Sequence, residues 1–148
     1  MRIPDLLRDD EPSFSFEFFP PKTEEAEVTL FHNIKTLAQL EPDFVSVTYG
    51  AAGSTRDGTV DVSARIQNEV GIETMAHLSC VGETIAGLEA ILDRLGEAGI
   101  ENVLALRGDP PAGETECRAT EGGLEYSRHL VEPIGRDYGS PIGAARFP

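Results

Sequence analysis

A repeat of short β-like runs, about 30 residues apart, constrains the fold of this chain more than any other feature. The runs occupy residues 13–19, 44–49, 73–80, 102–106 and 141–147. This period fits one strand followed by one helix. Because such units join with right-handed crossovers, successive strands lie parallel and adjacent, with helices packed against them. The repeat therefore predicts an α/β fold built on a parallel sheet.

Helical patterns fill the intervals between these runs. Thr23 can cap the first helix, and acidic residues follow it in the first turn. The second helix is expected to stop at Gly71, and the third to begin after Thr84 and to end before Gly99. Pro133 removes a backbone donor in the fourth interval, which predicts a short or kinked helix there.

The chain has 148 residues, enough for one domain with a core, and its net charge is −14. This charge disfavours binding to nucleic acids or to anionic membrane surfaces. Cys80 and Cys117 have no paired spacing, and no stretch reads as a membrane span or a signal peptide, so a cytoplasmic location is expected. Residues 1–12 are expected to form a leader and residues 13–148 a single domain.

The first run alternates Phe with small or acidic residues and stops at a double proline. In a strand, Phe14, Phe16 and Phe18 lie on one face, where helices could bury them, and Glu17 lies on the other. A carboxyl group close to aromatic surface loses solvation, which would make Glu17 a usable proton donor near neutral pH. The alternative is an edge-strand glutamate that points at water.

Polar residues recur where the predicted strands end. Since the carboxyl ends of parallel strands lie on one side of the sheet, Glu17, Thr48, His77 and Asp109 are expected to converge there. Each has a structural alternative. Thr48 could cap the next turn, His77 could be a core histidine that donates to a backbone carbonyl, and Asp109 could pair with Arg107 at a strand end.

Four motifs resemble the methylenetetrahydrofolate reductase family, in its order and at its spacing. They are SFEFFPPK at 15–22, FVSVTYGA at 44–51, HLSC at 77–80 and ALRGDPP at 105–111. The resemblance runs from about residue 13 to the last residue. It implies a (β/α)8 TIM barrel that binds FAD, of which this chain holds about the first five strands and four helices. That architecture agrees with the strand–helix repeat.

The resemblance also implies a reaction. NADH or NADPH reduces FAD, and the reduced flavin converts 5,10-methylenetetrahydrofolate to 5-methyltetrahydrofolate, a step of one-carbon metabolism and methionine biosynthesis. Glu17 becomes the general acid that protonates a folate nitrogen, and Asp109 the acid that meets both flavin and folate, where its charge would stabilise a cationic iminium. The positions that match the family's flavin contacts are Thr48, Tyr49, Ala51, His77, Arg107, Gly108, Asp109, Tyr126, Ala145 and Phe147.

The chain departs from the family pattern in three respects. The family usually has a small residue where Arg146 lies, Pro133 is unusual in its helix, and barrels of this type usually need about 250 residues. The alternative function is therefore an inactive fragment, or a flavin- or folate-binding module without turnover. A lyase or aldolase is disfavoured because no Schiff-base lysine or metal cluster lies at a strand end. Open strand edges predict self-association into a homo-oligomer.

Overall fold

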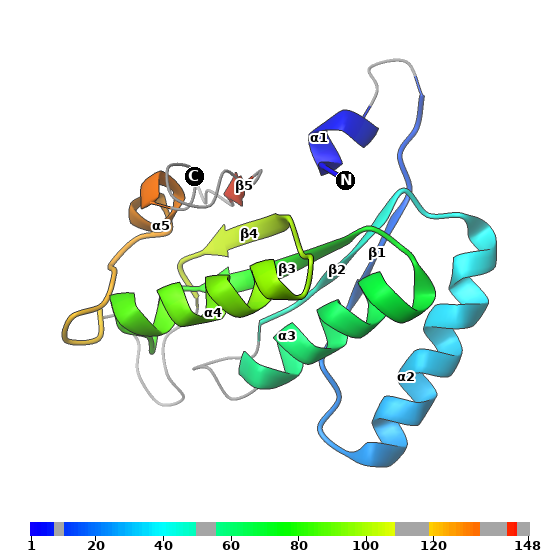
Figure 1. Cartoon of the computed structure of the whole chain (residues 1–148), viewed down its shortest axis with the longest axis horizontal. Helices are drawn as coiled ribbons and strands as arrows, with labels where there is room; N and C mark the ends of the chain where they lie inside the picture. Colours follow the sequence, from blue (N-terminus) through cyan, green and yellow to red (C-terminus); the bar gives the residue numbers. More distant parts are fainter. Residues whose placement is uncertain (8–10, 50–55, 109–118, 134–141, 145–148) are drawn as a thin grey trace.

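The computed structural model describes residues 1–7, 11–49, 56–108, 119–133 and 142–144 (Figure 1). Within these ranges the chain forms one parallel sheet of five strands in the order β1-β2-β3-β4-β5. The strands are β1 Ser15–Phe18, β2 Phe44–Val47, β3 Thr74–Ser79, β4 Asn102–Leu106 and β5 Ile142–Ala144. Each falls inside a predicted run, which confirms the α/β class and the strand order.

Helices connect the strands as the repeat predicts, and α2, α3 and α4 lie side by side along one face of the sheet (Figure 1). Their bounds are α2 Glu24–Leu37, α3 Arg56–Arg65, α4 Ile85–Glu97 and α5 Arg128–Pro133. Thr23 caps α2 by accepting a hydrogen bond from the Ala26 backbone N–H, and Thr84 caps α4 by accepting one from Gly87. The predicted Thr23 cap and the predicted start of the third helix after Thr84 are both confirmed.

Helix ends also follow the sequence. A π-helical segment, Ile66–Val70, continues α3 and ends at Gly71, whose φ of 80° is left-handed. A short 3-10 segment, Ala38–Leu40, follows α2. Helix α5 has 6 residues and ends at Pro133, as expected for a helix whose backbone loses a donor there.

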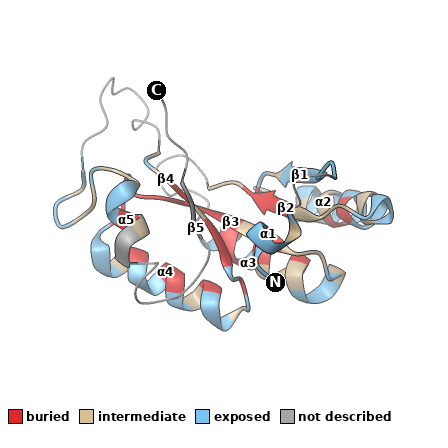
Figure 2. Ribbon diagram, turned by 90° about the horizontal axis from the view of Figure 1, so that it is seen from above, coloured by how far each residue is buried: buried red, intermediate tan, exposed pale blue. Residues whose placement is uncertain are grey.

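Two apolar clusters fill the space between the sheet and its helices. In one, Val45 and Val47 of β2 meet Phe31 and Ile34 of α2. In the other, alternate side chains of β3 and β4 meet the buried stripe of α4. Figure 2 shows the buried residues on the strands and on the sheet-facing sides of these helices. The members of the larger cluster are Val60, Ala76, Leu78, Cys80, Leu88, Ile91, Leu92, Leu95, Ile100, Val103, Ala105 and Leu130.

The prediction that three phenylalanines share one buried face is wrong for Phe14. Phe16 and Phe18 are half-buried and pack against the α2 cluster. Phe14 lies before β1 begins and is 65% exposed, and its backbone N–H donates to the Asp43 carboxylate instead. The alternation of a strand applies only where the chain is a strand, so it does not orient this side chain.

The first residues of the chain close the amino-terminal end of the sheet. Helix α1, Ile3–Leu6, begins at the buried Ile3, whose N–H donates to Oδ1 of Asn102 over 2.9 Å. The Asn102 amide donates to the Met1 carbonyl over 2.9 Å and to the Glu73 carboxylate over 2.8 Å. The first part of the expected leader is thus packed at the start of β3 and β4. No helix in the described ranges has the length and apolarity needed to cross a membrane.

Candidate active site

A carboxylate, a hydroxyl and an imidazole meet on the sheet face opposite α2–α4. Ser46 is the register partner of Glu17 on the neighbouring strand, and its Oγ donates to Glu17 Oε2 over 3.3 Å. The Nε2 atom of His77, on β3, lies 3.5 Å from the same oxygen. Ser46 and His77 are buried, whereas the Glu17 side chain is 52% exposed. The site therefore holds one oxygen of a solvent-accessible carboxylate against two buried polar groups.

The desolvation expected for Glu17 is not found. Phe16 and Phe18 point toward the helices, so they lie on the other side of β1 from the carboxylate. The exposure of the Glu17 carboxylate fits the alternative of an edge-strand glutamate that points at water. Its contact with the buried His77 does not fit that alternative, because an isolated edge residue would have no such neighbour. The polar contacts, and not aromatic surface, distinguish Glu17 from other surface glutamates.

His77 is buried, and its surroundings favour the neutral ring. Burial lowers the pKa of the His77 imidazole, and the nearby Glu17 carboxylate opposes this shift only in part. Among the described residues, His77 Nε2 has no hydrogen-bond partner. The alternative of a satisfied core histidine is therefore not supported at this nitrogen. A buried polar atom without a partner is costly, which makes Nε2 a position where a ligand could bond.

A second group of polar residues surrounds the loops that follow β2 and β3. The Tyr49 hydroxyl donates to Glu83 Oε1 over 3.3 Å, and Glu83 is only 4% exposed. Thr48 contributes its carbonyl, which accepts a bond from the Thr59 hydroxyl over 2.9 Å. The sequence analysis missed Glu83. Its place just before the Thr84 cap of α4, where a carboxylate is favourable, was the available signal.

The loop after β4 packs closely on the end of β3. The Ser79 hydroxyl donates to the Arg107 carbonyl over 3.2 Å. Gly108 follows with a φ of 93°, and a Cβ at this position would lie 2.1 Å from Ser79 Oγ. Only glycine fits both the left-handed backbone and this close approach. The backbone of the predicted flavin-contact segment is therefore fixed against β3.

An aromatic ring with two arginines lies beside this loop. The Arg107 guanidinium carbon is 5.4 Å from the centre of the Tyr126 ring, and that of Arg128 is 4.6 Å from it. His129 meets the same ring edge-on at 5.5 Å. In a chain of net charge −14, this is a local concentration of positive charge around an aromatic surface.

The structure thus places several predicted site residues and leaves others undescribed. Glu17 and His77 come together, and Arg107, Gly108 and Tyr126 form the neighbouring group. The predicted site residues outside the described ranges are Ala51, Asp109, Ala145 and Phe147. Arg146, which departs from the family pattern, lies outside them as well.

Within the described ranges no group of His, Cys, Asp and Glu is suited to a metal ion. Burial raises the pKa of the Cys80 thiol to about 11, so this thiol is protonated near neutral pH.

Comparison with known proteins agrees with the motifs. Residues 2–148 match the family model described as methylenetetrahydrofolate reductase. The chain is 41% identical over 142 residues to "Methylenetetrahydrofolate reductase (NADH) 1" of Arabidopsis thaliana, which covers 96% of this chain and 24% of that protein. It is 46% identical over 134 residues to "5,10-methylenetetrahydrofolate reductase" of Escherichia coli K12, covering 90% of this chain and 43% of that protein. The chain spans less than half the length of these relatives, and its parallel sheet is part of the family's TIM barrel. The chain belongs to the methylenetetrahydrofolate reductase family.

Proposed function

We propose that this chain carries the amino-terminal part of a flavin-dependent reductase site, which converts 5,10-methylenetetrahydrofolate to 5-methyltetrahydrofolate with NADH or NADPH. The observation that carries the proposal is the Glu17 carboxylate, which accepts a hydrogen bond from Ser46 and lies 3.5 Å from the buried His77 on a parallel sheet. In α/β folds the carboxyl end of the sheet is where sites are built. The family membership supports the reaction class.

FAD fits the residues that surround this end of the sheet. His77 Nε2 is a buried polar atom without a described partner, so a polar ring atom of a bound group would satisfy it. Gly108 fixes the backbone after β4 against Ser79, and Tyr126 with Arg107 offers a ring and a cation beside it. We propose that these residues hold the flavin, together with Thr48, Tyr49, Ala51, Asp109, Ala145 and Phe147.

Glu17 is proposed as the proton donor. The bound flavin supplies hydride transfer between the nicotinamide and the one-carbon unit of the folate. Opening the five-membered folate ring requires a proton on the departing nitrogen, and a protonated Glu17 delivers it. The Ser46 hydroxyl holds one oxygen of the carboxyl group beside His77, and the 52% exposure of the Glu17 side chain lets water return the proton after each turnover. Asp109 is proposed to stabilise the positive charge that forms on the folate.

A binding module without turnover is the second candidate. It is favoured by the share of the relatives that the chain spans, 24% of the plant protein and 43% of the bacterial one. Other parts of the site would then lie outside this segment. A preference for small molecules over nucleic acids or anionic membranes belongs to the same proposal and rests on the charge of −14. A cytoplasmic location is proposed with it.

Flavin binding and flavin reduction separate the two candidates. The purified chain is titrated with FAD, and the flavin absorbance is followed on addition of NADH or NADPH without oxygen. The reductase proposal predicts that bound flavin is bleached and that methylenetetrahydrofolate restores its colour. Flavin that binds without being reduced supports the module. A chain that binds neither FAD nor folate contradicts both.

A further inference from the structure

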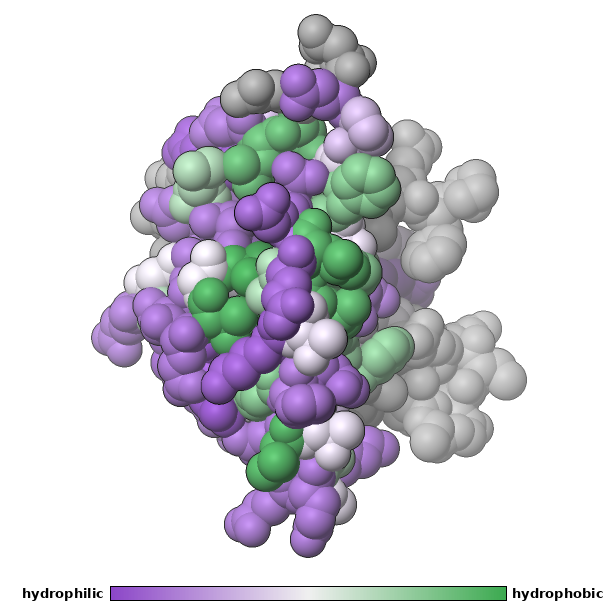
Figure 3. All heavy atoms as spheres, turned by 90° about the vertical axis from the view of Figure 1, so that its right-hand side faces the viewer, coloured by the Kyte–Doolittle hydropathy of each residue, from purple (hydrophilic) through white to green (hydrophobic). Residues whose placement is uncertain are grey.

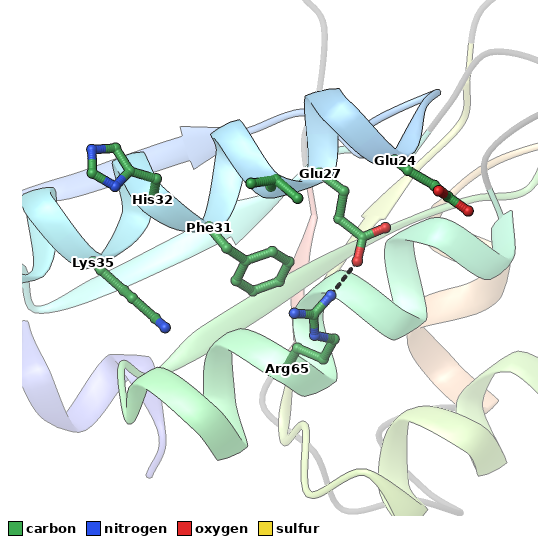
Figure 4. A pocket seen from close by; sticks show the side chains of 7 residues that line it. Glu24, Glu27, Phe31, His32, Lys35 and Arg65 are labelled. Atoms are coloured by element: carbon green, nitrogen blue, oxygen red, sulfur yellow. Dashed lines mark hydrogen bonds and ion pairs between the residues drawn. The ribbon is translucent and has the colours of Figure 1, made fainter.

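A hollow on the outer helical layer is held together by its own side chains. It is about 630 Å³ in volume and runs between α2 and the end of α3 (Figure 4). Its Arg65 lies over the Phe31 ring and pairs with Glu27 and Glu69. Figure 3 shows apolar surface among hydrophilic residues on this side of the molecule. The contacts of Arg65 join the two helices, which gives this residue a structural role.

Glu83 differs, because it is a buried acid beside the candidate site that the proposed reaction does not use. It is only 4% exposed. Acidic side chains are almost never fully buried without a partner, because removing them from water costs free energy. Glu83 Oε1 accepts a hydrogen bond from the Tyr49 hydroxyl over 3.3 Å. Since Tyr49 is one of the proposed flavin contacts, the buried acid meets the site through this ring.

The backbone on both sides of Glu83 is fixed. Its N–H donates to the Cys80 carbonyl over 3.3 Å, which closes a turn after β3. Gly82, at the third position of that turn, has a φ of 84°, a left-handed value that glycine adopts without strain. Thr84 follows and caps α4. The Glu83 side chain therefore starts from a defined point between a turn and a helix cap.

Two glycines let the chain close around Glu83. A Cβ at Gly87 would lie 2.8 Å from Glu83 Oε2, and a Cβ at Gly123 would lie 2.3 Å from the Glu83 carbonyl oxygen. The Gly122 carbonyl accepts a hydrogen bond from the Ile85 N–H over 2.9 Å, so this segment lies on the start of α4. The carboxyl group is therefore confined against the first turn of α4.

Different elements hold the two ends of the Tyr49 side chain. Its ring is half-buried and packs against the larger apolar cluster. The preceding residue, Thr48, donates its N–H to the Phe18 carbonyl over 2.9 Å and accepts through its own carbonyl from the Thr59 hydroxyl. The hydrogen bond to Glu83 restrains the hydroxyl end, which apolar packing alone does not orient.

We infer that Glu83 is a positioning residue of the proposed flavin site, which holds the Tyr49 ring in the orientation in which Tyr49 meets the flavin. This role rests on the proposed function, since Tyr49 is taken as a flavin contact. A ring that is already ordered loses less conformational freedom when a ligand binds. Loss of the anchor should therefore weaken FAD binding by about 3- to 10-fold, the cost of ordering one side chain.

Titration of the chain with FAD, followed by flavin fluorescence, tests this role. E83A removes the hydrogen-bond acceptor and should raise the dissociation constant by about 3- to 10-fold. E83Q keeps an oxygen that can accept from the Tyr49 hydroxyl, so its constant should stay within about twofold of the original. E97A is the matched control, because Glu97 is exposed at the other end of α4 and the substitution changes the net charge equally.

Tyr49→Phe attacks the same contact from the other side. It removes the hydroxyl but keeps the ring, and it should weaken FAD binding by a factor similar to that of E83A. Because both changes break one hydrogen bond, Y49F/E83A should bind FAD no more weakly than the weaker single variant, whereas independent effects would multiply. Circular dichroism checks that each variant is folded.

Fluorine NMR of the flavin-free chain reports on the ring itself. Incorporation of 3-fluorotyrosine labels the 3 tyrosines of the chain, and Y49F identifies the signal of Tyr49. E83A should shift or broaden this signal and leave the signal of Tyr126 in place. E97A should move neither.

The outcomes separate failure of this role from failure of the proposed function. FAD binding that is weakened by E83A and Y49F without further loss in the double variant, and kept in E83Q and E97A, supports the role. A dissociation constant unchanged in Y49F, a loss that E83Q shares with E83A, or a Tyr49 signal that does not respond to E83A overturns it and leaves the flavin site standing. If E83A does not fold, Y49F and E83Q decide in the same way. A wild-type chain that does not bind FAD overturns the proposed function, and the role of Glu83 falls with it.

Discussion

His77 and Glu17 stand in an unequal relationship: a buried imidazole nitrogen lies 3.5 Å from a carboxylate that is half open to solvent. Burial lowers the pKa of the His77 imidazole and so favours its neutral ring. The pair is therefore not a strong ion pair near neutral pH. The Glu17 side chain remains open to solvent on its other side.

Glu17→Gln should separate the two half-reactions of a preparation that turns over. Only folate reduction needs a proton on a ring nitrogen, and general acid catalysis is typically worth about 10²–10⁴-fold. Folate reduction should fall by that factor, whereas flavin reduction by the nicotinamide should stay nearly unchanged. Stopped-flow absorbance measures both steps. Glu25→Gln, on the exposed side of α2, is the control, and equal losses in both steps would show that Glu17 is not the acid.

Ser46→Ala tests whether the Ser46 hydroxyl positions Glu17. The variant loses the 3.3 Å hydrogen bond to Oε2 but keeps the backbone register with β1. A hydrogen bond to a charged group is worth about 1.5–3 kcal/mol, so the folate step should slow by about 10-fold or more. Flavin reduction should change little. A large drop in melting temperature with equal slowing of both steps would indicate a structural role instead.

His77 should make the stability of the fold depend on pH. Its folded pKa lies below the ordinary value of 6.5, so the unfolded chain binds the proton more readily. The stabilisation is fully present above pH 6.5 and is lost as the pH falls through the folded pKa. The effect cannot exceed about 1.4 kcal/mol per pH unit. Urea unfolding at pH 7.5 and 5.5 should show this loss in the wild type and less of it in His77→Gln.

The exposed His32 provides the control for this titration. His32→Gln removes a histidine from the exposed surface of α2, and the pH dependence that arises from the burial of His77 should be kept in this variant. If His77→Gln and the wild type lose the same free energy of unfolding between the two pH values, the assigned environment of His77 is wrong.

Gly108→Ala should be strongly destabilising. The new Cβ would lie 2.1 Å from Ser79 Oγ and 3.2 Å from Val81 Cβ, at a backbone φ of 93° that alanine rarely adopts. A strained position and a clash together should cost about 2 kcal/mol or more. Gly96→Ala is the matched control, because a Cβ there meets nothing within 4 Å in the last turn of α4. That change should stabilise by up to about 1 kcal/mol in urea unfolding.

Local signals in the sequence predicted most of the fold. Thr23 and Thr84 cap the first backbone N–H groups of their own helices, and Gly71 ends the second connecting helix in the left-handed region. Each of these interactions joins residues a few positions apart, so the sequence contains both partners side by side. The strand positions followed in the same way from the repeat.

The contacts within the candidate site were less predictable. Ser46 reaches Glu17 only because β1 and β2 pair in one register, and Tyr49 reaches Glu83 across 34 positions. Such contacts depend on register and loop geometry, and a shift of one residue would turn each side chain to the other face. The prediction for Phe14 fails for a related reason. The alternation of side chains was applied to the residue before β1 begins, where no strand orients the side chain.

The Asn102 side chain has a consequence for the order in which this protein folds. Its amide holds the Met1 carbonyl and its oxygen holds the Ile3 N–H, 99 positions earlier in the chain. During synthesis, residues 1–6 must therefore wait until β4 has been made before they can dock on Asn102. Closing so long a loop costs entropy that only a formed sheet can offset. Docking of α1 is then a late event of synthesis, which follows the formation of the fourth strand.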